Sequence, residues 1–475
     1  MDADNTSRLY TGLSRNANGA KSSRGEEMAG KKSKSFDTEL LDNLIDSGVT
    51  YVYPGLFDHD GIWRCKKVPL DQFSEFLATG WSFIDALPWW GPNDTVREDR
   101  AFRSEACEFD SGSVRNFPFE PDSVAIVADY TGENMERSSR TILKTQIEKA
   151  KKMGFDVLGA SEFEFIVLDQ TAEEINEFGH DSLTGFCPEN RCWSGVLPSA
   201  AADLLARYEE TLSDGEVDLH HICSELGPGC LEASLLVKPL LRAADDAAFF
   251  KLFTRSFFSQ EYKTASFMAQ LSGDFPGLGG HPIMSLRDKK TGRPVLFDNN
   301  KKLSVLGKKF VAGIVRLIPE LTALYASNIN SFRRYAPGNW APRTATWGYG
   351  NYTCGLRVVA SPLEQGRIEF RLPGADVNPF SAFSMMLGAG LHGIKNNWSL
   401  PPETKKMGRD LIPADIGTVP RSLLEAADYL ARSKAARQIF GDKYVEHCVA
   451  CCVHEDEFMR SHVSSFERQR YLFHV

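Results

Sequence analysis

The sequence predicts an α+β protein with a small N-terminal domain and a larger second domain. Its 475 residues exceed the length of one ordinary domain, so two domains are expected. A composition of 42% hydrophobic and 25% charged residues is typical of a soluble globular protein. Strand-like pieces between Gly and Pro turns come first, and amphipathic helical patterns with strand candidates between them follow.

Three segments divide the chain. Residues 1–36 are rich in Ser, Asn, Gly, Lys and Arg and predict a flexible tail. Residues 37–130 combine a short helix with strand candidates and indicate a small α+β domain; residues 131–475 form the second domain. The strand candidates of the first domain are 50–53 and 123–127, and the helical patterns of the second are 140–153, 200–213, 243–270, 302–326, 379–396 and 422–471.

The charge excludes some partners. A formal net charge of -9 argues against nucleic acid or an anionic membrane as the main partner. No apolar run is long enough for a membrane span, and the polar N-terminus does not resemble a secretory signal. We therefore expect a cytoplasmic protein without nucleic-acid or membrane partners.

Ten cysteines are scattered without a disulfide spacing pattern, which fits reduced thiols. The run from His447 to His454 places soft ligands at helical spacing, so a zinc site has to be considered there. The favoured alternative is that these cysteines pack on or beside a helix as small apolar side chains.

One stretch, GASEFEFIVLD, combines acidic and apolar residues in alternation. An extended chain places Glu162 and Glu164 on one face and Phe163, Phe165 and Val167 on the other. Two neighbouring carboxylates repel and lose hydration when partly buried, unless a cation lies between them. The stretch therefore indicates a metal site, and an exposed strand edge is the alternative.

A second stretch, RIEFR, places Arg367, Glu369 and Arg371 on one strand face. Two guanidinium groups around a carboxylate suggest an anionic ligand, and a surface ion-pair ladder is the alternative.

Two more segments supply metal-ligand chemistry. Glu225 and Glu232 flank a Gly-Pro-Gly turn, and His281 follows a glycine-rich loop, where a structural histidine is the alternative. Carboxylates with one imidazole suit Mg²⁺ or Mn²⁺, and arginines suit phosphates. No Walker-type loop or dinucleotide glycine pattern competes with this interpretation.

Five motifs, in the order in which they occur along the chain, resemble those of the glutamine synthetase family. They are GASEFEF from Gly159, GPGCLE from Gly227, GLGGH from Gly277, NSFRRYAPGNWAP from Asn330 and RIEFR from Arg367. The resemblance covers about residues 37–475. It implies a β-grasp N-terminal domain, a catalytic domain with a curved antiparallel sheet, and a homo-oligomeric ring, a hexamer or dodecamer, with sites at subunit interfaces.

The resemblance also implies roles for individual residues. Two to three Mg²⁺ or Mn²⁺ ions and ATP would bind here, and glutamate would attack the γ-phosphate to give γ-glutamyl phosphate, which an amine then converts to an amide. The implied metal ligands are Glu164, Glu225 and Glu232 for one ion and Glu162, His281 and Glu369 for another. The implied glutamate contacts are Gly277, Arg334 and Arg371; the implied nucleotide contacts are Ser285, Arg357, Arg367 and the Tyr352 position; the implied catalytic residues are Arg357, Glu369 and Trp340.

Three departures from the family pattern bear on the substrate. Trp340 stands where ammonia-using members carry a glutamate, and an indole can pack against the apolar body of an organic amine. Where ammonia-using members carry an Asp-Gly-Ser-Ser-like loop, Asp85 is kept as an acid near the amine, and Trp89 and Trp90 make the neighbourhood aromatic. Packing of these tryptophans at a domain or subunit interface is the alternative. Tyr352 replaces an arginine that faces ATP phosphate, and Cys230 replaces a glutamine, which puts nucleotide affinity in question.

The resulting hypothesis is an ATP-dependent ligase that joins the γ-carboxylate of glutamate to an organic amine, aromatic or alkyl, such as aniline. The alternatives are a polyamine or ethanolamine γ-glutamyl ligase, an ordinary glutamine synthetase, and a non-catalytic descendant that keeps the ring for a structural role. Retention of all six implied metal ligands disfavours the last.

Overall fold

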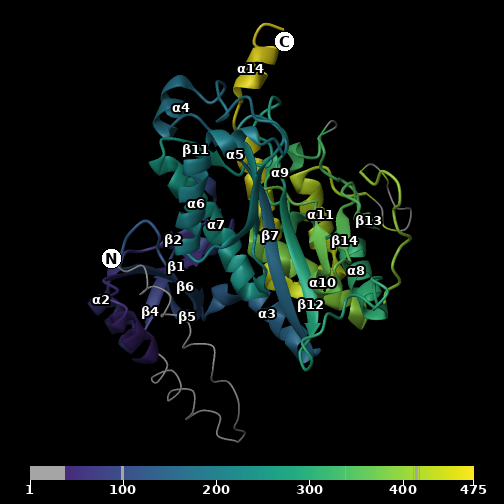
Figure 1. The fold of residues 1–475 in the computed structure, drawn as a ribbon, viewed down its shortest axis with the longest axis horizontal. Helices are drawn as coiled ribbons and strands as arrows, with labels where there is room; N and C mark the ends of the chain where they lie inside the picture. Colours follow the sequence, from purple (N-terminus) through teal and green to yellow (C-terminus); the bar gives the residue numbers. More distant parts are fainter. Residues whose placement is uncertain are drawn as a thin grey trace, which may run out of the picture.

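Two sheets organise the chain in the computed structural model, which describes residues 38–97, 101–336, 339–409, 411, 416 and 418–474 (Figure 1). The tail expected over residues 1–36 lies outside the described residues. The α+β class expected from the sequence is confirmed, because helices cover both sheets rather than alternating regularly with parallel strands.

Within the described residues, six strands form the first sheet in the order β2-β1-β6-β5-β4, with β3 also paired to β1. The central pair, β1 and β6, is parallel, and the other pairs are antiparallel. A helix over 38–46 and helix α2 (Leu70–Thr79) pack on the sheet through Leu40, Leu44 and Phe73. The strands are β1 (Tyr51–Phe57), β2 (Trp63–Cys65), β3 (Val68–Pro69), β4 (Trp81–Ile84), β5 (Ser104–Asn116) and β6 (Ser123–Tyr130).

Nine strands of the described chain form the second sheet, in the order β13-β14-β15-β12-β7-β9-β8, with β10 and β11 also paired to β7. All of these pairs are antiparallel except β13 with β14, which is parallel at the edge of the expected antiparallel sheet. The strands are β7 (Phe155–Leu168), β8 (Leu219–Ser224), β9 (Cys230–Leu235), β10 (Lys238–Pro239), β11 (Thr264–Ser266), β12 (Gly280–Asp288), β13 (Trp347–Tyr349), β14 (Leu356–Val359) and β15 (Arg367–Phe370).

The back face of β7 packs against helix α7 (Leu240–Gln260), which lies beside it in Figure 1. Phe163 stacks on Phe250 with ring centres 5.6 Å apart, and Phe165 and Val167 are fully buried. Each such phenylalanine contributes on the order of 2–3 kcal/mol when it leaves water. Burial of this face fixes the register and turns the alternate residues of β7, including its two glutamates, to the opposite face.

Further helices pack around the second sheet, whereas α14 (Ser465–Tyr471) has no buried residue and projects from the body (Figure 1). Helix α10 (Pro379–Lys395) is apolar on all sides and is buried against α8 (Val305–Leu317) and α3 (Ser139–Lys152). Close approach of α10 to α8 requires glycine, because a Cβ at Gly393 would lie 2.3 Å from the Lys309 carbonyl oxygen. Among the described helices, none is long and apolar enough to cross a membrane. They are α3 (Ser139–Lys152), α4 (Ala172–Phe178), α5 (Val196–Ala200), α6 (Ala202–Asp214), α8 (Val305–Leu317), α9 (Ile329–Arg333), α10 (Pro379–Lys395), α11 (Leu423–Arg432), α12 (Lys434–Phe440), α13 (Asp442–Ser461) and α14 (Ser465–Tyr471).

Three predicted helices are shorter than their patterns. The helix expected over 243–270 ends at Gln260, because the next apolar residues enter β11 and pair with β7. The helix expected over 302–326 ends at Leu317, two residues before Pro319, which has no backbone N–H to continue the helical hydrogen bonds. The pattern over 422–471 forms four helices instead of one. One of the breaks between them lies at Gly441, whose φ of +90° is a backbone conformation that favours glycine.

Arg140 of α3 joins the two sheets. Its guanidinium donates to Asp129 of β6 at 2.7 Å, to Asp110 of β5 at 2.9 Å and to Asp245 of α7 at 2.8 Å. The group is buried, so its three carboxylate partners compensate a charge that would otherwise be costly. The ion pairs therefore fix the first sheet against the helices that support β7.

Candidate active site

The front face of β7 directs Glu162 and Glu164 toward the neighbouring strands. Backbone register places Glu162 opposite His281 of β12 and Glu164 opposite Glu232 of β9. Directly opposed residues of an antiparallel pair share a face. The sheet therefore brings together four of the six residues that the resemblance assigns to metal ions.

Glu162, His281 and Glu369 form one tight group, whose ligand atoms all lie within 4.8 Å of one another. His281 Nδ1 is 3.3 Å from Glu162 Oε1, and its Nε2 is buried without a hydrogen-bond partner in the described chain. Gly279 makes room for this ring, because a Cβ there would lie 2.3 Å from Nε2. Ser234, two residues after Glu232 on β9 and not identified from the sequence, donates to Glu162 at 3.1 Å.

The neighbouring carboxylates perturb one another. Burial and the charges of Glu162, Glu164 and Glu225 raise the pKa of Glu232. Burial also acts to raise the pKa of Glu162, but the hydrogen bond and charge of His281 bring it below its ordinary value. Burial and the charge of Glu164 raise the pKa of Glu225. Such mutual repulsion is relieved when a cation binds between the carboxylates.

A second group of ligand atoms was not identified from the sequence. His221 and Cys223 of β8 and Glu232 of β9 offer ligand atoms within 4.8 Å of one another. The Cys223 thiol lies 3.8 Å from the Glu232 carboxylate. Cys192 likewise donates to Glu225 at 3.5 Å. The surroundings of Glu225 and Glu232 therefore contain softer atoms than the carboxylates predicted there.

Two arginines hold the Glu369 carboxylate. Arg357 Nη1 of β14 donates to Oε2 at 2.7 Å, and Arg371 Nη1 donates to Oε1. Glu369 lies opposite Arg357 in the sheet and is 1% exposed. The predicted sharing of one face by Glu369 and Arg371 is therefore confirmed.

Tyr352 lies against both arginines. Its ring centre is 3.8 Å from the Arg357 guanidinium carbon and 5.2 Å from that of Arg371. Its hydroxyl accepts from Arg357 Nη2 at 2.9 Å, and its carbonyl accepts from Arg371 Nε at 3.1 Å. Tyr352 thus orients both arginines.

Arg334 lies buried next to Gly277. Its Nη1 donates to the Leu372 carbonyl at 2.9 Å, while its Nε is buried without a partner among the described groups. A Cβ at Gly277 would lie 3.0 Å from the Arg334 side chain, so a larger residue at position 277 would displace the arginine. Gln270 and Asn339, which were not identified from the sequence, hydrogen-bond each other here at 2.9 Å.

Ser285 and Arg367, the two remaining residues expected to contact the nucleotide, extend this face along their strands. Ser285 of β12 is four residues beyond His281 and shares its face. Arg367 begins β15 and donates to the Gln365 carbonyl at 3.5 Å. Cys230, by contrast, begins β9 and is fully buried in the core.

Trp340 is 70% exposed, an unusual state for an indole. The Arg409 guanidinium lies 5.2 Å from its ring centre. Residues 337–338 of the same loop lie outside the described chain.

Asp85, Trp89 and Trp90 have their described contacts away from this site. Trp89 packs edge-on against His447 of α13 with ring centres 4.5 Å apart, and Trp90 Nε1 donates to Asp94 at 2.8 Å. Asp85 is buried and accepts from the Arg103 backbone at 2.9 Å. Within one chain, Trp89 therefore packs between the first domain and the C-terminal helices.

The residues present fit a divalent cation. The buried Nε2 of His281, which has no partner among the described groups, and the raised pKa of Glu232 both favour binding of a positively charged ligand at this face. Carboxylates with one imidazole are the donor set that Mg²⁺ and Mn²⁺ accept.

Comparison with known proteins gives concordant matches over most of the chain. A family model described as "Glutamine synthetase, catalytic domain" matches residues 136–471. Glutamate–isopropylamine ligase of a Pseudomonas species is 32% identical over 457 residues, which are 93% of this chain and 99% of that protein. Type-1 glutamine synthetase 2 of Dictyostelium discoideum is 29% identical over 459 residues, which are 93% and 88% of the two chains. A solved structure described as "Apo GmaS without ligand" superposes with a TM-score of 0.78 at 21% identity and covers 92% of this chain and 100% of that chain, which is a likeness of fold.

Proposed function

The chain belongs to the glutamine synthetase family of ATP-dependent carbon–nitrogen ligases, and on that premise we propose that it joins the γ-carboxylate of glutamate to an organic amine through γ-glutamyl phosphate. The observation that carries the proposal is the Glu162–His281–Glu369 group with two arginines on Glu369. It combines a cation site and guanidinium groups, which a reaction between two anions requires.

The proposed metal ligands are those expected from the resemblance. Glu162, His281 and Glu369 would hold one ion, and Glu164, Glu225 and Glu232 another, with two to three Mg²⁺ or Mn²⁺ ions per site. When bound, the ions supply positive charge for the phosphate oxygens of ATP.

The arginines and glycine would bind the two anionic substrates. Arg334 and Arg371 would hold glutamate, with Gly277 offering its backbone to the amino-acid end. The buried Arg334 Nε without a described partner supports this role, because it leaves a donor for a ligand. Arg357, Arg367 and Ser285 would face ATP, and Tyr352 would orient Arg357 by the stack and hydrogen bond described above.

An apolar amine is favoured over ammonia by Trp340. Its exposed ring offers apolar surface in the loop that follows Arg334, where an organic substituent gains burial and ammonia does not. The 32% identical relative named for isopropylamine supports a small alkylamine, and aniline is a larger, aromatic candidate. A polyamine or ethanolamine is the within-class alternative.

We also propose a homo-oligomeric ring, a hexamer or dodecamer, with active sites between subunits. Asp85, Trp89 and Trp90 would then complete the site of a neighbouring copy, which is consistent with their described contacts lying elsewhere in their own chain. The exposed Phe466 and Leu472, at helix α14 and just beyond it, offer apolar surface for such contacts. Mass photometry of the purified protein measures the subunit number directly.

The deciding experiment measures phosphate release with ATP, glutamate and Mg²⁺ across a panel of isopropylamine, aniline, putrescine, ethanolamine and ammonia. Mass spectrometry of each product confirms the γ-glutamyl amide. A small alkyl or aromatic amine should give the highest kcat/KM. If ammonia were used at least as efficiently as every organic amine, the organic-amine assignment would be wrong, and the glutamine synthetase alternative would replace it.

A further inference from the structure

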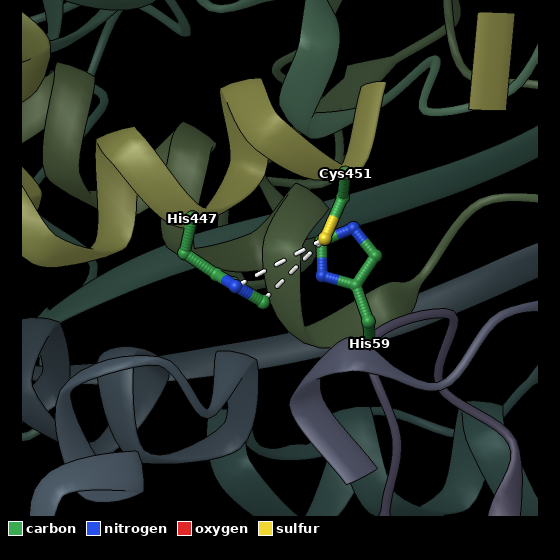
Figure 2. A group of neighbouring side chains, drawn as sticks. All are labelled: His59, His447 and Cys451. Atoms are coloured by element: carbon green, nitrogen blue, oxygen red, sulfur yellow. Dashed lines mark hydrogen bonds between the residues drawn. The ribbon is translucent and has the colours of Figure 1, made fainter. Parts of the chain in front are cut away.

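His59, His447 and Cys451 form a third group of ligand atoms, which has no residue in common with the active-site groups. All their ligand atoms lie within 4.8 Å of one another. Figure 2 shows the three side chains converging from two parts of the chain. His447 and Cys451 are one turn apart on α13, and His59 comes from the turn between β1 and β2.

The cysteines of the His447–His454 run are buried on a helix, as the packing alternative predicts. Cys448 and Cys452 belong to the apolar core of the second domain. Cys451 points instead toward the imidazole of His447 and toward His59 (Figure 2). The sequence run alone could not identify His59, because about 390 residues separate it from its neighbours.

The spacing of the group is close to that of a zinc site. The Cys451 sulfur lies 3.9 Å from Nδ1 and 3.8 Å from Nε2 of His447. With Zn–N bonds of about 2.0 Å and a Zn–S bond of about 2.3 Å, two ligand atoms on a tetrahedral ion are about 3.5 Å apart. The pair on α13 therefore already has nearly this separation, and His59 has to approach by no more than about 1.3 Å.

Acidic side chains near the group offset part of the charge of an ion. His447 and Cys451 are each 2% exposed, so an ion between them would be shielded from water. Arg97 pairs with Asp60 at 3.0 Å and approaches Glu455 at 3.9 Å. One thiolate and these two carboxylates offset much of the +2 charge of zinc and the +1 charge of Arg97.

We propose that His59, His447 and Cys451 bind one zinc ion, which ties the β1–β2 turn of the first domain to the C-terminal helix α13. Imidazole and thiolate ligands select zinc, whereas the carboxylate groups on β7 suit Mg²⁺ or Mn²⁺. Three protein ligands leave the fourth position of a tetrahedral ion to water.

Packing alone also holds these side chains together, so the test has to detect the metal. The His447 ring lies edge-on to His59 at 5.0 Å and to Trp89 at 4.5 Å between ring centres, contacts that need no ion. Thermal stability without metal analysis would not separate the two explanations.

The first measurement is the zinc content of the full-length protein after chelation, saturation with Zn²⁺ in excess Mg²⁺, and gel filtration. Wild type should retain one zinc per chain more than Cys451→Ser. Cys452→Ser, which removes the adjacent buried thiol of the same helix, should retain as much as wild type. Equal zinc in wild type and Cys451→Ser would overturn the proposal.

The second measurement replaces Zn²⁺ with Co²⁺ and records the thiolate-to-cobalt charge-transfer band, which carboxylate sites do not produce. The band should persist in Cys223→Ser and disappear in Cys451→Ser. Loss in Cys223→Ser with retention in Cys451→Ser would move the soft-metal site to the His221–Cys223–Glu232 group and refute the proposal.

If Cys451→Ser fails to fold, His59→Asn tests the same point from the turn, outside the helical core. It should reduce the affinity for Zn²⁺ at least tenfold and abolish the rise in melting temperature that Zn²⁺ gives wild type. Unchanged zinc affinity in His59→Asn would show that the turn is not tied to α13 by a metal.

Discussion

The ring of Tyr352 lies against the guanidinium of Arg357, with 3.8 Å between the ring centre and the guanidinium carbon. The hydroxyl of the same tyrosine accepts from Arg357 Nη2 at 2.9 Å. The tyrosine thus fixes the direction of a neighbouring cation without adding charge.

The first prediction concerns this pair. Tyr352→Phe keeps the stack and removes the acceptor, and one hydrogen bond to a charged group contributes about 1.5 kcal/mol. We therefore expect the KM for ATP to rise roughly tenfold, and Tyr352→Leu, which also removes the ring, to raise it further. Tyr262→Phe is the matched control, because Tyr262 is 80% exposed. Steady-state kinetics in ATP that are identical for all four proteins would contradict the orienting role.

The second prediction tests the cation group. His281→Ala and Glu369→Gln should each reduce turnover at least about a hundredfold, since each removes a ligand for the charge that neutralises phosphate. The subunit number measured by mass photometry should not change. Glu364→Gln is the control and should keep full turnover. It removes a carboxylate whose side chain is 73% exposed and, among the contacts described for it, pairs only with Arg287. Near-normal rates in the His281 and Glu369 variants would remove the metal interpretation.

The third prediction concerns glutamate. Arg371 directs Nη1 to Glu369 and Nε to the Tyr352 carbonyl, an arrangement that a lysine ammonium cannot reproduce. Arg371→Lys should raise the KM for glutamate about tenfold, equivalent to about 1.4 kcal/mol, with a smaller effect on the KM for ATP. Arg287→Lys makes the same exchange at an exposed ion pair and serves as the control. An unchanged glutamate KM in Arg371→Lys would exclude the assigned contact.

The fourth prediction addresses the amine. Burial of about 100 Å² of apolar surface against Trp340 is worth roughly 2–3 kcal/mol at 25 cal/mol per Å². Trp340→Ala should therefore reduce the preference for a bulky amine over ammonia by tenfold or more, and Trp340→Glu should shift it further toward ammonia. The measurement is the ratio of kcat/KM for the two amines, with Trp193→Ala, another exposed tryptophan, as the control. Equal ratios in wild type and Trp340→Ala would place the amine elsewhere.

Alternation along strands predicted the parts of the site that a single strand determines. The separation of Glu162 from Phe163, and of Glu369 from Phe370, follows from the period of two and the burial of the apolar face. The position of His281 beside Glu162 depends on register between strands more than a hundred residues apart, which no local pattern specifies. The family resemblance supplied that pairing.

Other parts of the site were beyond any local signal. The stack of Tyr352 on Arg357 depends on how the loop before β14 folds back over the sheet. His221 and Cys223 approach Glu232 because β8 pairs with β9, a pairing that no local pattern specifies. Helix ends were misplaced for a similar reason, since pairing of β11 with β7 overrode the helical pattern beyond Gln260.

The packing of His59 and Trp89 against α13 has a consequence for how the protein is made. At about 5 to 20 residues per second, a ribosome needs about 20 to 80 seconds to proceed from His59 to His447. During this interval the nascent first domain can pair its own strands, but the surface that later contacts α13 has no partner. Docking of His59 and Trp89 onto α13 is therefore a late step, and until then the ring of Trp89 lacks its contact with His447.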